Sequence, residues 1–354
     1  SASNDDVLKS SRPFHFNGNT YEHLDDTIAA AIEAGGGTIY VEDGTYYTDP
    51  EDDCNFEISG GKSITITAYN PGGVTFESDD NDYLFIITDE KTHIVFNHIN
   101  FKKGSAIDGG AFEVRNNGQL TLNWCTLTEN RASDYGGAVS VKDRGSFIAQ
   151  NCHFTNNWAE DDGGAIASEE DGSVTLENCY FEGNTIGKDK IENDFGYEDG
   201  AGKPGTWSIT DCLFKGHGSL DEIEVDAPSK SVEITPNVHD DVNLVVLYKD
   251  GSYCTEKPWA SFHSVEFTDL EKGTYTVYMM KDDERRYEYP NTSFTIIEPY
   301  FVLDDKDVFE YLRDAVNAIP NGGSGVITVE GGTYTDYRNF NVQIRNKVVT
   351  IRHD

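Results

Sequence analysis

The chain has 354 residues, of which 63 are acidic and 27 are basic, so its formal net charge is −36. A nucleic-acid partner held by a basic surface is excluded, because phosphate contacts need lysine and arginine. The acidity favours an extracellular setting and divalent cations as ligands, and the sequence has no run of 18 apolar residues that would predict a membrane span.

An N-terminal tail, residues 1–15, precedes the amphipathic segment "YEHLDDTIAAAIEAGGGTIYVEDGTYY". Leu24, Ile28, Ala31 and Ile32 recur at helical spacing, and a glycine run follows them. We expect a helix that caps the open end of a β-structure, because such an end exposes unpaired backbone and apolar side chains.

Three units with a 27-residue period follow, each with Gly-Gly-Ala near its start and Phe-x-x-Asn or Leu-x-x-Asn at its end. They occupy residues 109–130, 136–157 and 163–184. Each unit holds three short runs in which apolar and polar residues alternate, the pattern of half-buried strands. The same residue types return at the same phase, which favours coils stacked about 4.8 Å apart over a hairpin meander. The fold class predicted for residues 16–228 is therefore an all-β, right-handed parallel β-helix.

Stacking of such coils places like residues in columns. A corner column, where close backbone approach or a positive φ is expected, holds Gly118, Gly145, Gly172 and Gly205. Inward columns hold Cys125, Cys152, Cys179 and Cys212, and beside them Phe154, Phe181 and Phe214. An amide ladder at the turn holds Asn130, Asn157 and Asn184.

The cysteine column is predicted to hold free, buried thiols. Parallel stacked residues keep their Cβ atoms about 4.8 Å apart, longer than a disulfide favours. A metal cluster would need ligands that converge on one point, which a straight column does not provide. Between Cys179 and Cys212 the spacing is 33 residues, which predicts an inserted loop of about six residues.

Residues 229–298 lose the repeat and show short strands separated by turns, which predicts an immunoglobulin-like β-sandwich. "DLEKGTYTV" has the form of a tyrosine corner, with Tyr275 at the start of a late strand. From residue 299 the N-terminal pattern returns. Leu312, Val316 and Ile327 match Leu24, Ile28 and Ile39 at a constant offset of 288. We therefore expect a capping helix and the first coil of a second β-helix in 299–354, and a chain that is a piece of a longer array or joins its neighbours end to end.

The paired Gly-Gly-Ala and Phe-x-x-Asn motifs resemble the repeat of chlamydial polymorphic outer-membrane proteins. They also resemble the β-helical adhesin-like proteins of methanogenic archaea, in which a β-helix, an immunoglobulin-like unit and another β-helix follow one another. The resemblance covers about residues 16–217 and restarts at 301. It implies a secreted cell-surface protein involved in attachment.

Two candidate binding features share one edge of the predicted coils. Possible calcium ligands recur just before the Gly-Gly pairs, where neighbouring coils could bring carboxylates together: Asp108, Asp134, Asp161 and Asp162. A solvated acidic turn is the simpler interpretation and the one favoured for an acidic protein. The same edge carries aromatic residues suited to a sugar-binding face or a packing face between subunits: Tyr135, Trp158, Phe195 and Tyr197.

The main alternative is a carbohydrate-active enzyme, because polysaccharide lyases and pectin hydrolases also use β-helices. Gly216-His217-Gly218 resembles a polygalacturonase motif, and Asp161 with Asp162 could supply its carboxylates. The basic residue of that family is not visible downstream, and His217 falls at the phase of the asparagine ladder, so no catalytic residue is expected.

The sequence thus predicts a non-catalytic, adhesin-like protein at the cell surface that requires no cofactor and binds a glycan or a protein ligand. A third interpretation is a structural subunit that polymerises through residues 301–354.

Overall fold

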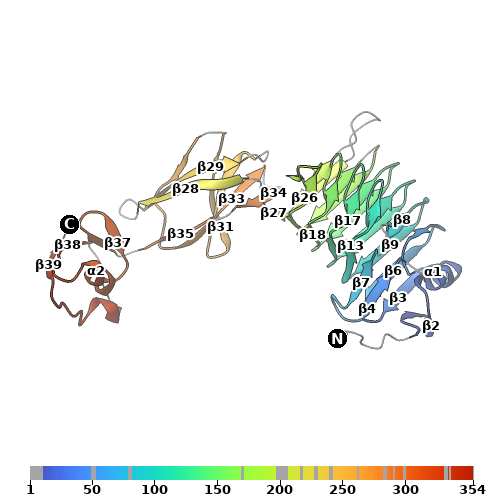
Figure 1. The fold of residues 1–354 in the computed structure, drawn as a ribbon, viewed down its shortest axis with the longest axis horizontal. Coiled ribbons are helices and arrows are strands. Elements are labelled where there is room, and N and C mark those ends of the chain that lie inside the picture. The colour runs from blue at the N-terminus through green and yellow to red at the C-terminus, as the bar shows by residue number, and fades with distance from the viewer. Residues whose placement is uncertain are drawn as a thin grey trace. The chain divides into compact units, whose positions relative to one another are not determined.

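The computed structural model describes the greater part of the chain. The described residues are 11–48, 53–78, 82–168, 171–196, 206–215, 218–226, 230–238, 242–260, 263–281, 285–289, 292–297, 300–330, 334 and 336–353. They divide into two compact units: the residues up to 215 together with 285–287, and the remainder (Figure 1).

The first unit begins with an antiparallel hairpin and a helix. The hairpin is formed by β1 (Phe14–Phe16) and β2 (Asn19–Tyr21), and the helix is α1 (Leu24–Glu33). The helix buries Leu24, Thr27, Ile28 and Ala31, the face set by its apolar spacing. It ends at the predicted glycine run, where a Cβ on Gly36 would lie 2.4 Å from a neighbouring backbone oxygen. The helix and β1 both contact β3, the first strand of the coils.

The coils form a β-solenoid, as predicted, with strands that pair in parallel from one coil to the next (Figure 1). Sheet A contains β3 (Gly37–Val41), β6 (Ser63–Ala68), β9 (His93–Asn97), β13 (Gln119–Asn123), β17 (Ser146–Gln150), β21 (Ser173–Glu177) and β26 (Thr206–Thr210). Sheet B contains β4 (Gly44–Tyr47), β7 (Val74–Glu77), β10 (Ile99–Lys102), β14 (Thr126–Thr128), β18 (His153–Thr155), β22 (Tyr180–Glu182) and β27 (Cys212–Lys215).

The first predicted run of each unit, directly after the Gly-Gly pair, forms sheet C. It contains β5 (Phe56–Ile58), β8 (Phe85–Ile87), β12 (Phe112–Val114), β16 (Val139–Val141), β20 (Ile166–Ser168) and β25 (Phe195–Gly196). A fourth, two-residue strand that the sequence did not reveal forms sheet D. It contains β11 (Ser105–Ala106), β15 (Arg131–Ala132), β19 (Trp158–Ala159) and β23 (Thr185–Ile186), with β24 (Ile191–Glu192) antiparallel to β23.

The Gly-Gly pairs lie between sheets D and C. The first glycine of a pair is required by its backbone conformation, and the second by close contact with the next coil. Gly136 has φ 65°, a conformation that costs residues with a Cβ about 1–2 kcal/mol. A Cβ on Gly137 would lie 2.2 Å from the Gly164 oxygen of the next coil. In the predicted corner column, a Cβ on Gly118 or Gly145 would lie 2.8 or 2.5 Å from a backbone oxygen, and the positive φ falls on the preceding residue, 62° at Arg144. Gly205 lies outside the described residues.

The predicted columns form the core of the solenoid. Phe154, Phe181 and Phe214 stack in register with ring centroids 4.8 Å apart at each step. All three are fully buried, and each burial contributes about 1.5–3 kcal/mol. β34 (Arg285–Glu288) follows β27 in sheet B, and Tyr287 continues the stack at 5.0 Å from Phe214.

The asparagine ladder is confirmed in detail. The Asn157 Oδ1 atom accepts hydrogen bonds from the backbone N–H and the side-chain amide of Asn130, both at 3.0 Å. Asn184 accepts the same pair from Asn157 at 3.1 and 2.9 Å, and the Asn157 amide also donates to the Leu127 oxygen. Each amide therefore connects successive coils with its buried hydrogen-bonding groups satisfied.

The cysteine column holds free, buried thiols, as predicted. The Cys152 Sγ atom donates to the Leu122 oxygen at 3.4 Å, and Cys125 and Cys179 make the equivalent bond to the preceding coil. Burial raises the pKa of Cys152 well above its usual range. The thiols therefore act as small apolar residues with a weak donor.

The second unit contains two antiparallel sheets. One is formed by β28 (Gly218–Asp226), β29 (Ser231–Val238) and β32 (Val265–Phe267). The other includes β30 (Leu244–Lys249), β31 (Ser252–Pro258), β33 (Gly273–Lys281) and β35 (Ser293–Ile296). The Tyr275 hydroxyl donates to the Glu271 oxygen at 2.9 Å, the backbone bond expected of a tyrosine corner.

Residues 301–353 repeat the topology of the N-terminus. They contain β36 (Phe301–Leu303), β37 (Asp307–Phe309), α2 (Leu312–Ala318), β38 (Ser324–Val329), the 3-10 helix η1 (Tyr337–Asn339) and β39 (Val348–His353). The order β37-β36-β38-β39 matches β2-β1-β3-β6. Ile351 pairs with Ile327 as Ile66 pairs with Ile39, yet Ile351 is 50% exposed and Ile66 is fully buried.

Candidate functional site

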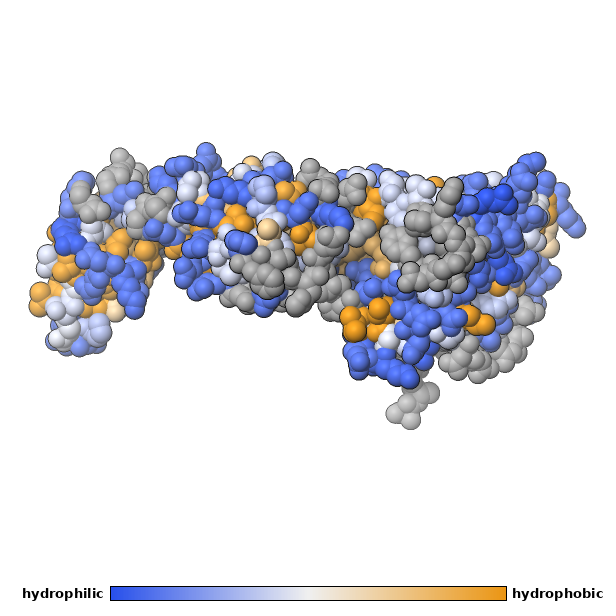
Figure 2. Space-filling model, turned by 90° about the horizontal axis from the view of Figure 1, so that it is seen from above, coloured by the Kyte–Doolittle hydropathy of each residue, from blue (hydrophilic) through white to orange (hydrophobic). Residues whose placement is uncertain are grey.

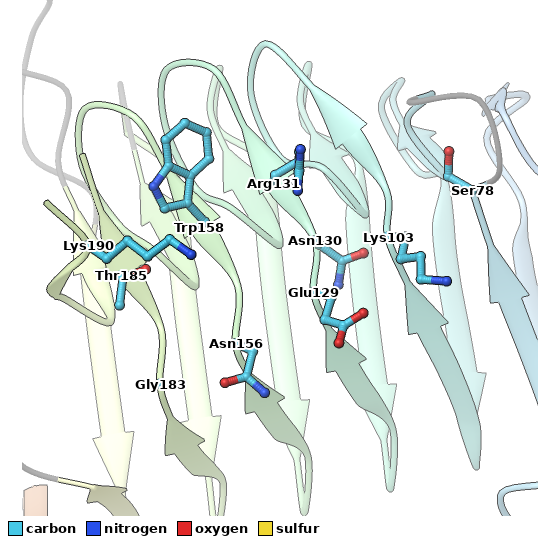
Figure 3. Close-up of a pocket in the computed structure, with 10 residues that line it drawn as sticks. All are labelled: Ser78, Lys103, Glu129, Asn130, Arg131, Asn156, Trp158, Gly183, Thr185 and Lys190. Carbon is cyan, nitrogen blue, oxygen red and sulfur yellow. The ribbon is translucent and has the colours of Figure 1, made fainter. Parts of the chain in front are cut away.

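A groove of about 760 Å³ runs over several coils of the solenoid where sheet B turns into sheet D (Figure 3). It is lined by Ser78, Lys103, Glu129, Asn130, Arg131, Asn156, Trp158, Gly183, Thr185 and Lys190. The volume lies within the range of small-molecule sites.

Two columns of the repeat point side chains into this groove. The first comprises the left-handed residues that end the sheet B strands, such as Glu129 and Asn156 with φ 58° and 56°. The second is the first position of sheet D, where Arg131, Trp158 and Thr185 lie in parallel register. The next residue of β15 and of β19 is a buried alanine, so strand alternation turns Arg131 and Trp158 outward.

The inserted segment bounds the groove at its C-terminal end. After β23 the chain turns back as β24, and Lys190 lies in this turn. The Trp158 Nε1–H donates to the Gly187 oxygen at 2.9 Å, which ties the indole to the turn. Because the indole N–H, the only polar group of the side chain, is already hydrogen-bonded, Trp158 presents apolar ring surface to a ligand.

The lining of the groove is locally positive, whereas the net charge of the whole chain is negative. Its lining has three cations, Lys103, Arg131 and Lys190, against the single carboxylate of Glu129, in a chain of net charge −36. Lys103 pairs with Glu77 at 2.6 Å, and this hydrogen bond raises the pKa of Lys103. Within the described part of the chain, Arg131 and Lys190 have no ion-pair partner.

The predicted aromatic set has different outcomes. Trp158 lines the groove, whereas Tyr135 does not; the Tyr135 backbone N–H donates to the Asp108 carboxylate at 3.3 Å. The prediction that Phe195 stands exposed is wrong, because β25 carries it into sheet C. Its ring lies 5.1 Å from Phe181, 4.8 Å from Trp207 and 5.5 Å from Phe214. Tyr197 lies outside the described residues.

The structure does not gather the predicted calcium ligands. Asp108 pairs with Lys142 at 3.1 Å, and Asp134 accepts from the neighbouring Ser133 hydroxyl. Asp162 accepts from the Gly163 N–H at 2.9 Å and from the Asn193 amide. Among the residues that the structure describes, no group of three or more His, Cys, Asp or Glu side chains could hold a metal ion. The carboxylates instead hold turns and one ion pair.

The alternative catalytic set is only partly visible. Asp161 is exposed, and the Asp162 carboxylate is used by the turn before Gly163. His217 lies outside the described residues.

Sequence reasoning missed a second aromatic surface, at the corner between sheets A and B. His98 and Trp124 stack at 6.2 Å with an interplanar angle of 15°, and His153 lies 5.4 Å from Tyr180. Trp124 is 59% exposed and lines a hollow of about 300 Å³ with His153 and Tyr180. Their positions directly beside the cysteine column could have revealed them. The face seen in Figure 2 is largely hydrophilic, with separate apolar patches.

Comparisons with known proteins identify one repeat. Residues 151–169 match the Chlamydia polymorphic membrane protein repeat. The chain is thus similar to these proteins over part of one coil, from the cysteine column to sheet C. No match was found among curated proteins or among solved structures. In the described residues, no helix has the length and apolar character needed to cross a membrane.

Proposed function

We propose that this chain is an extracellular, surface-associated, adhesin-like protein that binds carbohydrate through the groove beside Trp158 and does not cleave it. The observation that carries the proposal is the groove itself, in which an indole ring, amide and hydroxyl side chains and cations meet over several coils. A glycan offers hydroxyls to the polar groups and an apolar ring face to the indole.

The repeat supports attachment as the role of the coils. Proteins of the matched family are surface-exposed, and an adhesin-like rod needs a rigid scaffold that presents a site. As parts of the same proposal, α1 and the β1–β2 hairpin cap the solenoid, the two antiparallel sheets form an immunoglobulin-like spacer, and the modular order is that of the archaeal adhesin-like proteins.

The proposal is tested by binding of neutral and acidic oligosaccharides to the wild-type chain, to Trp158→Ala and to Trp124→Ala. Loss of binding in Trp158→Ala alone supports the groove. Loss in Trp124→Ala alone places the site at the corner between sheets A and B and contradicts the proposed groove. Circular dichroism of each variant shows whether the fold is retained.

A carbohydrate-active enzyme remains the alternative. Hydrolysis needs an acid and a base about 5–9 Å apart, and the groove is lined by one carboxylate, Glu129. Release of reducing ends or unsaturated products from the same oligosaccharides would refute the non-catalytic role. Asp161→Asn and Asp162→Asn would then be assayed.

End-to-end association through residues 301–354 is a second candidate, favoured by the exposed Val348 and Ile351 of β39. Sedimentation velocity over a range of concentrations tests it. Growth of large species with concentration, suppressed by Ile351→Lys, would support it, and a concentration-independent sedimentation coefficient would refute it.

A further inference from the structure

We infer that the groove beside Trp158 takes an acidic glycan, a linear sugar chain with carboxylates, anchored by Arg131 and Lys190. The inference rests on the proposed carbohydrate binding and adds the chemical class of the ligand.

Charge is the first argument. Lys103 forms an ion pair with Glu77 at 2.6 Å. The other two cations of the groove, Arg131 and Lys190, have no ion-pair partner among the described residues. Both side chains are exposed. In a chain with 63 carboxylates, two such cations over one groove make a local site for anions. An arginine guanidinium can bind a carboxylate through two parallel hydrogen bonds.

The arrangement of the groove favours a chain over a single anion. Arg131, Trp158 and Thr185 occupy the same position in three successive coils, so their Cα atoms are about 4.8 Å apart along the solenoid. Lys190 lies in the turn that follows Thr185, and Figure 3 shows it at the Trp158 end of the groove. A linear polymer that runs across the coils would meet Arg131, then the indole, then Thr185 and Lys190.

The backbone argues against an acidic peptide. A peptide that binds by strand addition needs an open sheet edge. Here the backbone N–H groups of Arg131, Trp158 and Thr185 already donate to the preceding coil at 2.8, 2.9 and 2.9 Å. The groove therefore offers side chains and ring surface, which suit hydroxyls, ring faces and carboxylates.

The test uses the full chain and isothermal titration with a short galacturonate oligomer, its fully methyl-esterified form, and poly-glutamate. The ester keeps the sugar and removes the charge. We expect the acid to bind, the ester to bind at least about tenfold more weakly, and poly-glutamate to bind weakly or not at all. Binding of the acid should weaken with added salt.

The variant Arg131→Ala/Lys190→Ala should reduce acid binding to the level of the ester. Its matched control is Arg144→Ala/Lys91→Ala, which also removes one arginine and one lysine, but from exposed positions outside the groove. This control should bind the galacturonate oligomer as the wild type does.

The outcomes separate the two proposals. Equal binding of acid and ester, both lost in Trp158→Ala, would overturn the acidic class and leave carbohydrate binding intact. Stronger binding of poly-glutamate than of the galacturonate oligomer would overturn the inference that the ligand is a glycan. Binding of neither sugar would overturn both proposals, and equal losses in the two double variants would show a general charge effect and overturn the anchoring role.

Discussion

The buried side-chain amide of Asn157 forms hydrogen bonds that connect three successive coils. Its Oδ1 atom accepts two hydrogen bonds from Asn130, and its amide donates to the Leu127 oxygen and to Asn184. Asn157→Ala leaves these buried groups unsatisfied, so we expect the free energy of unfolding to fall by roughly 2–4 kcal/mol. Urea unfolding followed by circular dichroism measures the change. The control is Asn123→Ala, whose half-buried outer amide donates to Asn97; a comparable loss there would contradict the special role of the inner ladder.

The thiols give a second residue-scale prediction. Cys254 is exposed, whereas the other five cysteines are buried, and burial raises the pKa of Cys152. A thiol with a raised pKa forms the reactive thiolate only at higher pH. A colorimetric thiol reagent at pH 8 should therefore react rapidly with one thiol per native chain and with all six after denaturation. Cys254→Ser should abolish the rapid reaction, and rapid reaction of several thiols would show that the column is accessible.

At the scale of elements, the spacing of coils is set where backbones touch. A Cβ on Gly137 would lie 2.2 Å from the Gly164 oxygen and 2.5 Å from the Trp158 oxygen. Gly137→Ala must push neighbouring coils apart, so we expect it to destabilise the solenoid by about 3 kcal/mol or more. Gly44→Ala is the matched control, because its nearest contact would be 3.6 Å and its φ is not positive. Similar unfolding midpoints for the two variants would refute the steric argument.

Repetition decided how much of the molecule the sequence could predict. The Asn157 ladder and the cysteine column were predictable because one residue type returns at one phase. The position shared by Arg131, Trp158 and Thr185 holds a different residue in each coil, so self-similarity could not reveal the groove. Sheet D was missed because a two-residue strand is too short to show alternation. Phe195 was misplaced because the insertion hides its phase, and the ion pair of Asp108 comes from Lys142, 34 residues away.

At the scale of the whole molecule, the net charge of −36 predicts that added salt affects stability and ligand binding in opposite directions. Dissolved salt screens the repulsion among exposed carboxylates, with a Debye length of about 10 Å at 0.1 M, so the melting temperature should rise with sodium chloride. Binding of an acidic glycan to Arg131 and Lys190 should weaken over the same range. Calcium chloride at matched ionic strength should stabilise the chain no more than sodium chloride, because the described carboxylates gather no metal site. A much larger rise with calcium, measured by scanning calorimetry, would show that acidic side chains do assemble around the ion and would restore the calcium interpretation.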